Sequence, residues 1–219
     1  MSYLFDGYNW DLSDPNSIPN LLFAHLYITA ISLLIALVIA FPIALLITRY
    51  RRLYLPVITA AGIIYTIPSL ALFSFLIPTT GLNPPTLIIP LVLYAQIILI
   101  RNIAAAIGAV DPTLVEVGRA MGMNSVQLFL RVTLPLALPI IVAGIRVTTV
   151  TTIGIATLAP FIGVADLGTI IYEGRSFGLN RVLIGSGAFL VTALAISADL
   201  LLLALQAFLG RGQAITVRA

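Results

Sequence analysis

Glu116-Val117-Gly118-Arg119-Ala120-Met121-Gly122, followed after nine residues by Val132-Thr133-Leu134-Pro135, is the stretch that decides the fold of this chain. It is a polar element between long apolar runs that carry almost no charge. The chain has 219 residues, of which 60% are hydrophobic and 9% are charged, and its mean hydropathy is +1.13. Because these values are far from those of a water-soluble domain, we expect the protein to lie in a lipid bilayer.

Five apolar runs reach the roughly 20 residues that a helix needs to cross a bilayer. The sequence therefore predicts an all-α membrane protein with about five transmembrane helices in one domain. The expected spans are residues 21–48, 55–77, 86–108, 139–161 and 183–209. The expected divisions are an extracytoplasmic segment (1–20), a transmembrane domain (21–209) with a cytoplasmic loop (111–135), and a cytoplasmic tail (210–219).

The placement of arginine predicts the orientation, because cytoplasmic loops collect Arg and Lys near the membrane. With the N-terminus outside, eight arginines fall inside and only Arg175 and Arg181 fall outside. We therefore expect an extracytoplasmic N-terminus and a cytoplasmic C-terminus. The arginines lie at the ends of apolar runs and form no continuous patch, so nucleic acid is not an expected partner.

The cytoplasmic loop is predicted to form two short helices beneath the membrane. Asp111-Pro112 is a good helix start, because the carboxylate caps free amides and proline suits the first turn. Gly122 suits a helix end that needs a positive φ angle. Asn124-Ser125-Val126-Gln127 has the pattern of a capping box, and we expect the second helix to stop at Pro135 and Pro139. On spacing alone, an interfacial amphipathic helix fits equally well.

The complete pattern of this loop is more specific than its helical spacing. Glu116-Val117-Gly118, Arg119-Ala120-Met121, Gly122 and Val132-Thr133-Leu134-Pro135 stand in the order and spacing of the EAA loop, which the chain therefore resembles. That loop is the part of a binding-protein-dependent ABC importer's membrane subunit that engages the ATPase.

The resemblance assigns roles to individual positions. It implies that Glu116 and Gly122 face the ATPase and that Leu134 and Pro135 redirect the chain into the membrane. Val117 and Gly118 stand where two alanines are usual. Glycine lowers helix propensity by about 1 kcal/mol relative to alanine, so we expect the first helix to be less rigid.

The resemblance extends beyond the loop to the permease subunits for glycine betaine, carnitine, choline and proline. The matching stretches are Thr66-Ile67-Pro68-Ser69-Leu70-Ala71-Leu72, Arg101-Asn102, Val110-Asp111-Pro112, Gly122-Met123, Leu134-Pro135-Leu136-Ala137-Leu138-Pro139, Ala143-Gly144-Ile145-Arg146 and Thr152-Ile153-Gly154-Ile155-Ala156-Thr157-Leu158-Ala159. Membership implies a type I ABC importer (MetI-like) permease fold in a bacterial or archaeal cytoplasmic (inner) membrane.

The resemblance also implies the partners. These are an ATP-binding cassette ATPase, an extracytoplasmic substrate-binding protein, and a second permease copy or a homologous permease. The chain has no Walker A pattern and no lysine, so we expect it to bind no cofactor and to be no enzyme, with ATP and Mg used by the partner ATPase. The alternatives are a permease for amino acids or another small nutrient, and an ion-coupled secondary carrier.

Polar and helix-breaking residues inside the spans are candidates for the solute pathway or its gate, because such groups face protein or a cavity. Pro68 is expected to kink the second span, with Tyr65 and Ser69 on one face of the helix. A kink that only eases packing is the alternative. Thr148 and Thr152 belong to a small-residue stripe of the fourth span, which favours close helix packing over a solute route.

Arg146 and Asp199 are predicted to form an ion pair that pins the fourth and fifth spans, because they lie at comparable depths from the cytoplasmic side. Arg101 is an alternative partner, and the Arg146 side chain could instead extend to the membrane surface. His25, the only histidine, is expected to be an interfacial polar group. Asp166 is expected to be a solvated loop charge or, alternatively, to favour a cationic solute or contact a binding protein.

The sequence offers no covalent chemistry. It contains no cysteine and a single histidine, and no carboxylate cluster accompanies that histidine, so no metal site is expected. No serine or threonine has a base nearby in the sequence for nucleophilic catalysis.

Overall fold

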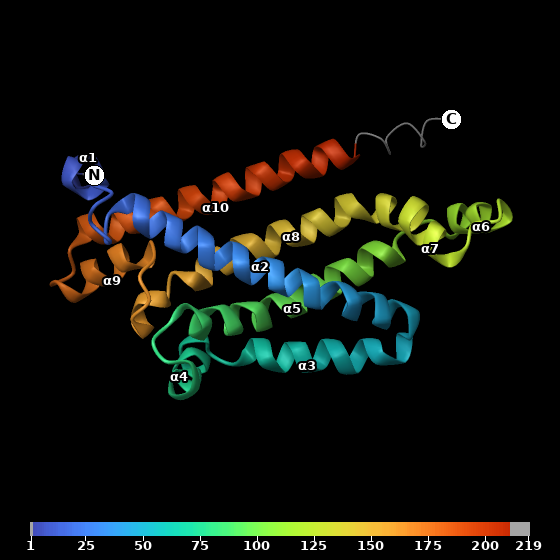
Figure 1. Cartoon of the computed structure of the whole chain (residues 1–219), viewed down its shortest axis with the longest axis horizontal. Coiled ribbons are helices and arrows are strands. Elements are labelled where there is room, and N and C mark those ends of the chain that lie inside the picture. The colour runs from blue at the N-terminus through green and yellow to red at the C-terminus, as the bar shows by residue number, and fades with distance from the viewer. Residues whose placement is uncertain (1, 211–219) are drawn as a thin grey trace.

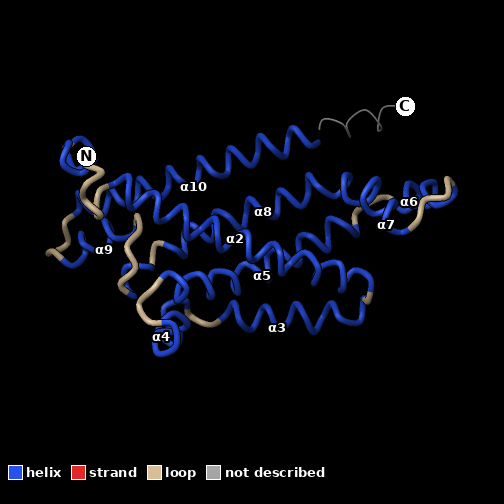
Figure 2. Tube along the Cα trace, in the orientation of Figure 1, coloured by secondary structure: helices blue, strands red, loops and turns tan. Residues whose placement is uncertain are grey.

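The computed structural model describes residues 2–210, and within that range every regular element is a helix or a helical turn (Figures 1 and 2). The α-helices are α1 (Ser2–Phe5), α2 (Ile18–Arg49), α3 (Tyr54–Thr66), α4 (Ser69–Thr80), α5 (Pro84–Gly108), α6 (Pro112–Ala120), α7 (Ser125–Leu128), α8 (Leu134–Ala156), α9 (Gly168–Ser176) and α10 (Arg181–Gly210). The short turns are η1 (Gly7–Trp10), η2 (Arg51–Leu53), η3 (Phe129–Thr133) and η4 (Ala159–Ile162). Most of the predicted tail lies outside the described residues.

The long helices run back and forth along one axis. Figure 1 shows α1 and α9 at one end of the molecule and α6 and α7 at the opposite end. We call these the α9 end and the knob end. The arrangement places the first residues and the α8–α10 connection together, away from the polar loop, as the predicted orientation requires. Which end faces the cytoplasm stays a prediction.

The expectation of about five apolar spans is confirmed. In the described range, four helical stretches are long and apolar enough to cross a membrane, and α3 with α4 gives a fifth when the bent pair is counted as one. The stretches correspond to α2, α5, α7 to α8, and α10. The all-helical fold class is therefore the one that the sequence predicted.

Two of the predicted spans differ from the structure. The second is not a kinked helix, because α3 and α4 meet at an angle of 88° across Ile67 and Pro68. The fourth was expected to begin at residue 139 and to end at 161. Instead the helical stretch runs from Ser125 to Ala156, and Phe161 lies in the turn η4. The predicted stop at Pro135 and Pro139 is wrong, because the helical stretch continues through both prolines: Pro135 follows a π-helical turn at the start of α8, and Pro139 lies inside α8.

Helix α5 lies at the centre of the packing and contacts α2, α3 and α8. Small residues permit this close approach: Ala36, Ala40 and Ala44 follow one face of α2 and are fully buried. On α8, a Cβ atom added at Gly144 would lie 2.5 Å from the Cβ atom of Asn102 on α5. In contrast, α10 packs on α8 and α9 and leaves most of its apolar surface exposed. That surface requires lipid or another protein around it.

Candidate functional site

The knob formed by α6 and α7 has the local structure that the sequence predicted. The Asp111 carboxylate caps α6 by accepting a hydrogen bond from the Thr113 N–H at 2.8 Å. Gly122 has a φ angle of +80°, the left-handed conformation that lets the chain turn after α6. Asn124 and Gln127 form the predicted capping box at the start of α7.

Gly118 has a packing role that the sequence analysis did not predict. It is the buried residue of α6, and an added Cβ atom would lie 2.6 Å from Cδ1 of Leu128 on α7. The missing side chain therefore lets the two knob helices pack closely. Helix propensity gives no sign of this contact, because Leu128 lies on α7, on the other side of the turn.

The outer surface of the knob is suited to docking. Glu116 is exposed, and so are the apolar side chains of Leu114, Val117 and Met121. Met121 is 71% exposed. Apolar side chains displayed around an acidic group at the tip of a protruding loop form an unsatisfied surface that a protein partner could cover.

Leu134 and Pro135 lie where the chain leaves the knob and enters α8. The preceding turn, Phe129–Thr133, is a π-helical turn, which adds a residue to the helical repeat. The direction of α8 is therefore set by a π-turn followed by Pro135, with no break in the helix. Sequence reasoning expected the change of direction but not its continuous form.

Tyr65, Pro68 and Ser69 surround the break between α3 and α4. Ile67 and Pro68 adopt extended backbone angles, so Tyr65 and Ser69 belong to different helices and share no helix face, contrary to the expectation. The Tyr94 hydroxyl donates a hydrogen bond to the Ile67 carbonyl at 2.9 Å. Tyr65 packs edge to face on Tyr94, with ring centroids 5.9 Å apart. Tyr94 therefore supports the break from α5, and the sequence gave no sign of this pairing.

Thr148 and Thr152 lie in the interior of the protein. Their hydroxyl groups donate to carbonyls of their own helix, those of Gly144 and Thr148, each at 2.8 Å. Both side chains are buried, so in this conformation neither lines an open pathway. Their placement corresponds to the helix-packing interpretation.

Arg146 and Asp199, on α8 and α10, are brought together. The guanidinium contacts the carboxylate through two parallel hydrogen bonds of 2.9 Å, and Arg146 Nη1 also donates to Gln206 at 2.8 Å. The two side chains keep 21% and 33% of their surface exposed. Arg101, the alternative partner, is exposed and makes no ion pair with the described residues. Arg146 and Asp199 thus form the predicted ion pair, and the pair remains partly exposed on the surface of the chain.

His25 and Asp166 form a contact that the sequence analysis missed. Nδ1 of His25 lies 2.8 Å from Oδ2 of Asp166, and both side chains are 0% exposed. The approach lacks the alignment of a hydrogen bond, and His25 Nε2 has no partner among the described residues. The expectations of an interfacial histidine and of a solvated loop aspartate are therefore wrong.

The loop around Asp166 is built to enclose its carboxylate. Oδ1 accepts the Gly168 N–H at 2.8 Å, and the Asp166 N–H donates to the Thr169 hydroxyl at 3.1 Å. A Cβ atom at Gly168 would collide with the Thr157 carbonyl, so only glycine fits there. Burial raises the pKa of Asp166, and His25 and the Gly168 N–H oppose that rise. No sequence pattern signals that a loop acid and a span histidine meet.

Among residues 2–210, no cluster of three or more His, Cys, Asp or Glu side chains could hold an ion. The candidate features of the described residues are thus an exposed knob, a broken span, the Arg146–Asp199 ion pair and the buried His25–Asp166 contact.

The fold and the site define the class of protein: a multi-pass helical membrane protein with a protruding two-helix loop between its third and fourth spans. The chain belongs to the family described as binding-protein-dependent transport system inner membrane component, which it matches over residues 32–213. It is therefore a membrane subunit of an ABC importer.

Characterised relatives resemble almost the whole chain. The glycine betaine/carnitine/choline transport system permease protein OpuCB of Bacillus subtilis is 39% identical over 81% of this chain and 82% of its own length. The osmoprotectant import permease protein OsmW of Salmonella typhimurium is 35% identical over 93% and 97%. Among solved structures, the inward-facing MetNI methionine ABC transporter is 25% identical, with a TM-score of 0.78 over 89% of this chain and 96% of that one.

Proposed function

We propose that this chain is the transmembrane permease subunit of an ATP-driven, binding-protein-dependent importer for a small osmoprotectant such as glycine betaine, carnitine, choline or proline. The observation that carries the proposal is the likeness, over most of the chain, to permeases named for glycine betaine, carnitine and choline or for an osmoprotectant. The MetNI likeness shows that the same fold also serves a methionine transporter, at lower identity. An amino-acid solute is therefore the second candidate.

The machinery around the permease follows from the same proposal. An ATP-binding cassette ATPase docks on the knob and hydrolyses ATP with Mg, an extracytoplasmic binding protein delivers the solute, and a second permease, identical or homologous, completes the pathway. The exposed Glu116 and the apolar side chains around it support the docking step, because none of the described residues 2–210 covers their surface. The chain itself contributes no phosphate-binding loop.

We place the solute pathway beside the break between α3 and α4. Quaternary ammonium groups bind to aromatic faces, and Tyr65, 41% exposed, stands in the last turn of α3 directly before the break. Interrupted helices near a pathway are a recurrent feature of transporters, because irregular backbone is tolerated where it lines a cavity. Thr148 and Thr152 are not part of this proposed surface.

Solute identity is tested by uptake in a bacterial strain that lacks osmoprotectant transport. The strain receives this chain with its ATPase, binding protein and any second permease, and labelled glycine betaine is competed with unlabelled carnitine, choline, proline and methionine. We expect the osmoprotectants to compete and methionine not to compete. If only methionine competed, the solute would be an amino acid rather than an osmoprotectant.

Coupling is tested by Glu116→Ala in the purified complex. Because Glu116 is proposed to face the ATPase, we expect uptake to fall about tenfold or more, the effect of losing about 1.4 kcal/mol of coupling. Glu173→Ala changes the only other glutamate, which lies on α9, and should transport normally. Full transport by the Glu116 variant without ATP would indicate an ion-coupled carrier instead.

A further inference from the structure

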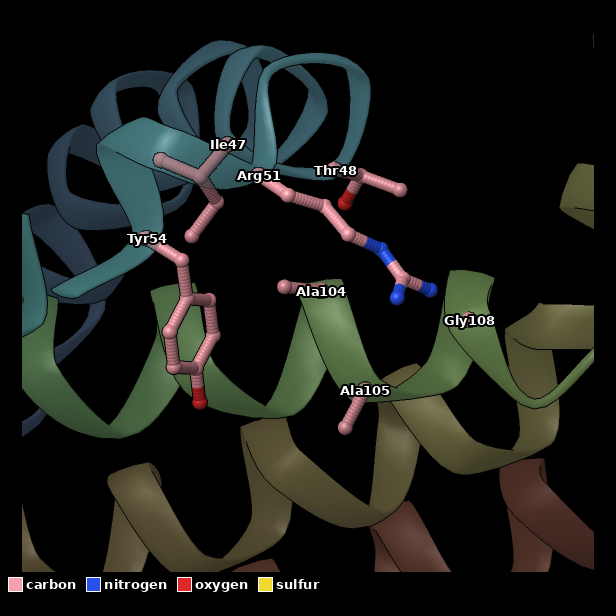
Figure 3. A pocket seen from close by; sticks show the side chains of 7 residues that line it. All are labelled: Ile47, Thr48, Arg51, Tyr54, Ala104, Ala105 and Gly108. Carbon is pink, nitrogen blue, oxygen red and sulfur yellow. The ribbon is translucent and has the colours of Figure 1, made fainter.

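A second site lies at the knob end, where α2 turns into α3. A cavity of about 360 Å³ opens there between the turn and the last turns of α5. It is lined by Ile47, Thr48, Arg51, Tyr54, Ala104, Ala105 and Gly108. Figure 3 shows the Arg51 guanidinium and the Tyr54 ring reaching from the turn toward the small residues of α5. The small residues leave the space that makes this a cavity.

The cavity presents unused hydrogen-bond donors. Within the described part of the chain, the Arg51 guanidinium makes no ion pair or side-chain hydrogen bond, and neither does the Tyr54 hydroxyl. The Thr48 hydroxyl donates to the Ala44 carbonyl and is already satisfied. No acidic residue lines the space. An arginine fork without a carboxylate, beside a phenolic donor, suits a phosphate anion.

The surroundings of the cavity are those of a membrane surface. Leu46, Tyr50 and Leu55 are exposed around the turn, and Arg49 and Arg52 flank Arg51. Tyrosines at the end of an apolar span, with arginines beside them, occupy the level of lipid headgroups. On the predicted orientation this end faces the cytoplasmic leaflet, where anionic lipids attract basic segments.

We propose that this cavity binds the phosphate of an anionic phospholipid headgroup. Arg51 holds two phosphate oxygens through its fork, Tyr54 donates a third hydrogen bond, and the acyl chains lie along the exposed apolar faces of α2 and α3. An aqueous phosphate has the same recognition chemistry but cannot use those apolar faces. A carboxylate of the ATPase is disfavoured, because the exposed Leu46 and Leu55 beside the turn suit acyl chains and the proposed docking surface lies on the knob.

The simplest competing account is that Arg51 only offsets the partial negative charge at the carboxyl end of α5. Both accounts predict that removing the charge changes stability, so stability alone does not separate them. Selective lipid retention does, because the helix-end account needs no ligand.

The test uses the purified full chain in a neutral detergent. Dioleoyl-phosphatidylglycerol and dioleoyl-phosphatidylcholine are titrated separately, and bound lipid is counted by native mass spectrometry. We expect phosphatidylglycerol to bind about tenfold more tightly. R51Q should abolish that preference, whereas R52Q, which removes the same charge from a neighbour outside the cavity, should retain it. Ala105→Leu, which fills the cavity without changing charge, should also abolish it.

Four results would overturn the proposal. Equal binding of the two lipids by the wild type would mean that no anion site exists. Equal loss in R51Q and R52Q would mean a diffuse basic surface. Displacement of phosphatidylglycerol by millimolar inorganic phosphate would assign the cavity to a soluble anion, and displacement by added ATPase would assign it to the partner protein.

Discussion

Asp111 and Asp166 precede short helices at opposite ends of the molecule, and each carboxylate accepts a backbone N–H two residues later at 2.8 Å. Asp111 is exposed, and the Thr113 N–H holds the pKa of its carboxyl below the usual value. Asp166 is fully buried against His25, and burial raises its pKa. The same local hydrogen bond, from a backbone N–H to the carboxylate two residues earlier, is thus exposed in one place and buried in the other. The surrounding fold determines which.

This difference in burial distinguishes the α9 end from the knob. The α9 end is attached to α2 by a contact removed from solvent, so its geometry depends on the whole bundle. The knob is held by local caps and by the close packing at Gly118, and its outer surface stays open. The knob presents its side chains outward, as the proposed docking role requires, whereas the loop at the α9 end encloses the Asp166 carboxylate.

Breaking the buried contact should have the largest effect. Asp166→Ala leaves His25 buried beside an apolar gap and the Gly168 N–H without its acceptor. We expect the free energy of unfolding to fall by about 1–3 kcal/mol for each buried polar group that loses its partner, measured by thermal or denaturant unfolding in detergent. Asp11→Ala, which removes an exposed loop carboxylate, is the matched control. If the two variants unfold alike, the His25 contact contributes nothing.

The Arg146–Asp199 pair should be intermediate, because its side chains are partly exposed. Arg146→Ala and Asp199→Ala should each lower the unfolding temperature by less than Asp166→Ala does. The double variant should be less damaged than the sum of the two single changes, since neither charge is left alone. Strict additivity in this double-mutant cycle would show that the two side chains are energetically independent.

The smallest effect should be on the pH dependence of the free energy of unfolding, to which Asp111 and Asp166 should contribute with opposite signs. The folded pKa of Asp111 is lowered, so its contribution is present above the unfolded value of about 3.9 and is lost as pH falls through the folded value. The folded pKa of Asp166 is raised, so its own contribution is present below about 3.9 and is lost as pH rises through the folded value.

Unfolding is therefore measured from pH 3 to pH 7 for the wild type, Asp111→Asn and Asp166→Asn. Relative to the wild type, Asp111→Asn should lower the free energy of unfolding chiefly toward neutral pH. Asp166→Asn should change the pH dependence of that free energy in the opposite direction. Profiles displaced in the same direction would contradict the comparison.

The sequence predicted features whose causes are local. Composition and run length predicted the spans, and the caps at Asp111 and Asn124 predicted the two knob helices, because each depends on neighbours within a few residues. The spacing of Arg146 and Asp199 predicted that they lie at similar depths. Pro68 predicted an interruption, but its size depends on the support that Tyr94 gives from α5.

What the sequence by itself determined is a helical membrane protein with a capped loop between two spans, since hydropathy and backbone capping act over short stretches of chain. Only the tertiary structure decided that His25 meets Asp166, that Gly118 is a packing position, and that α7 continues through a π-turn toward α8. Those outcomes depend on which distant surfaces are pressed together, and burial then changes the energy of each polar group far more than its immediate neighbours do.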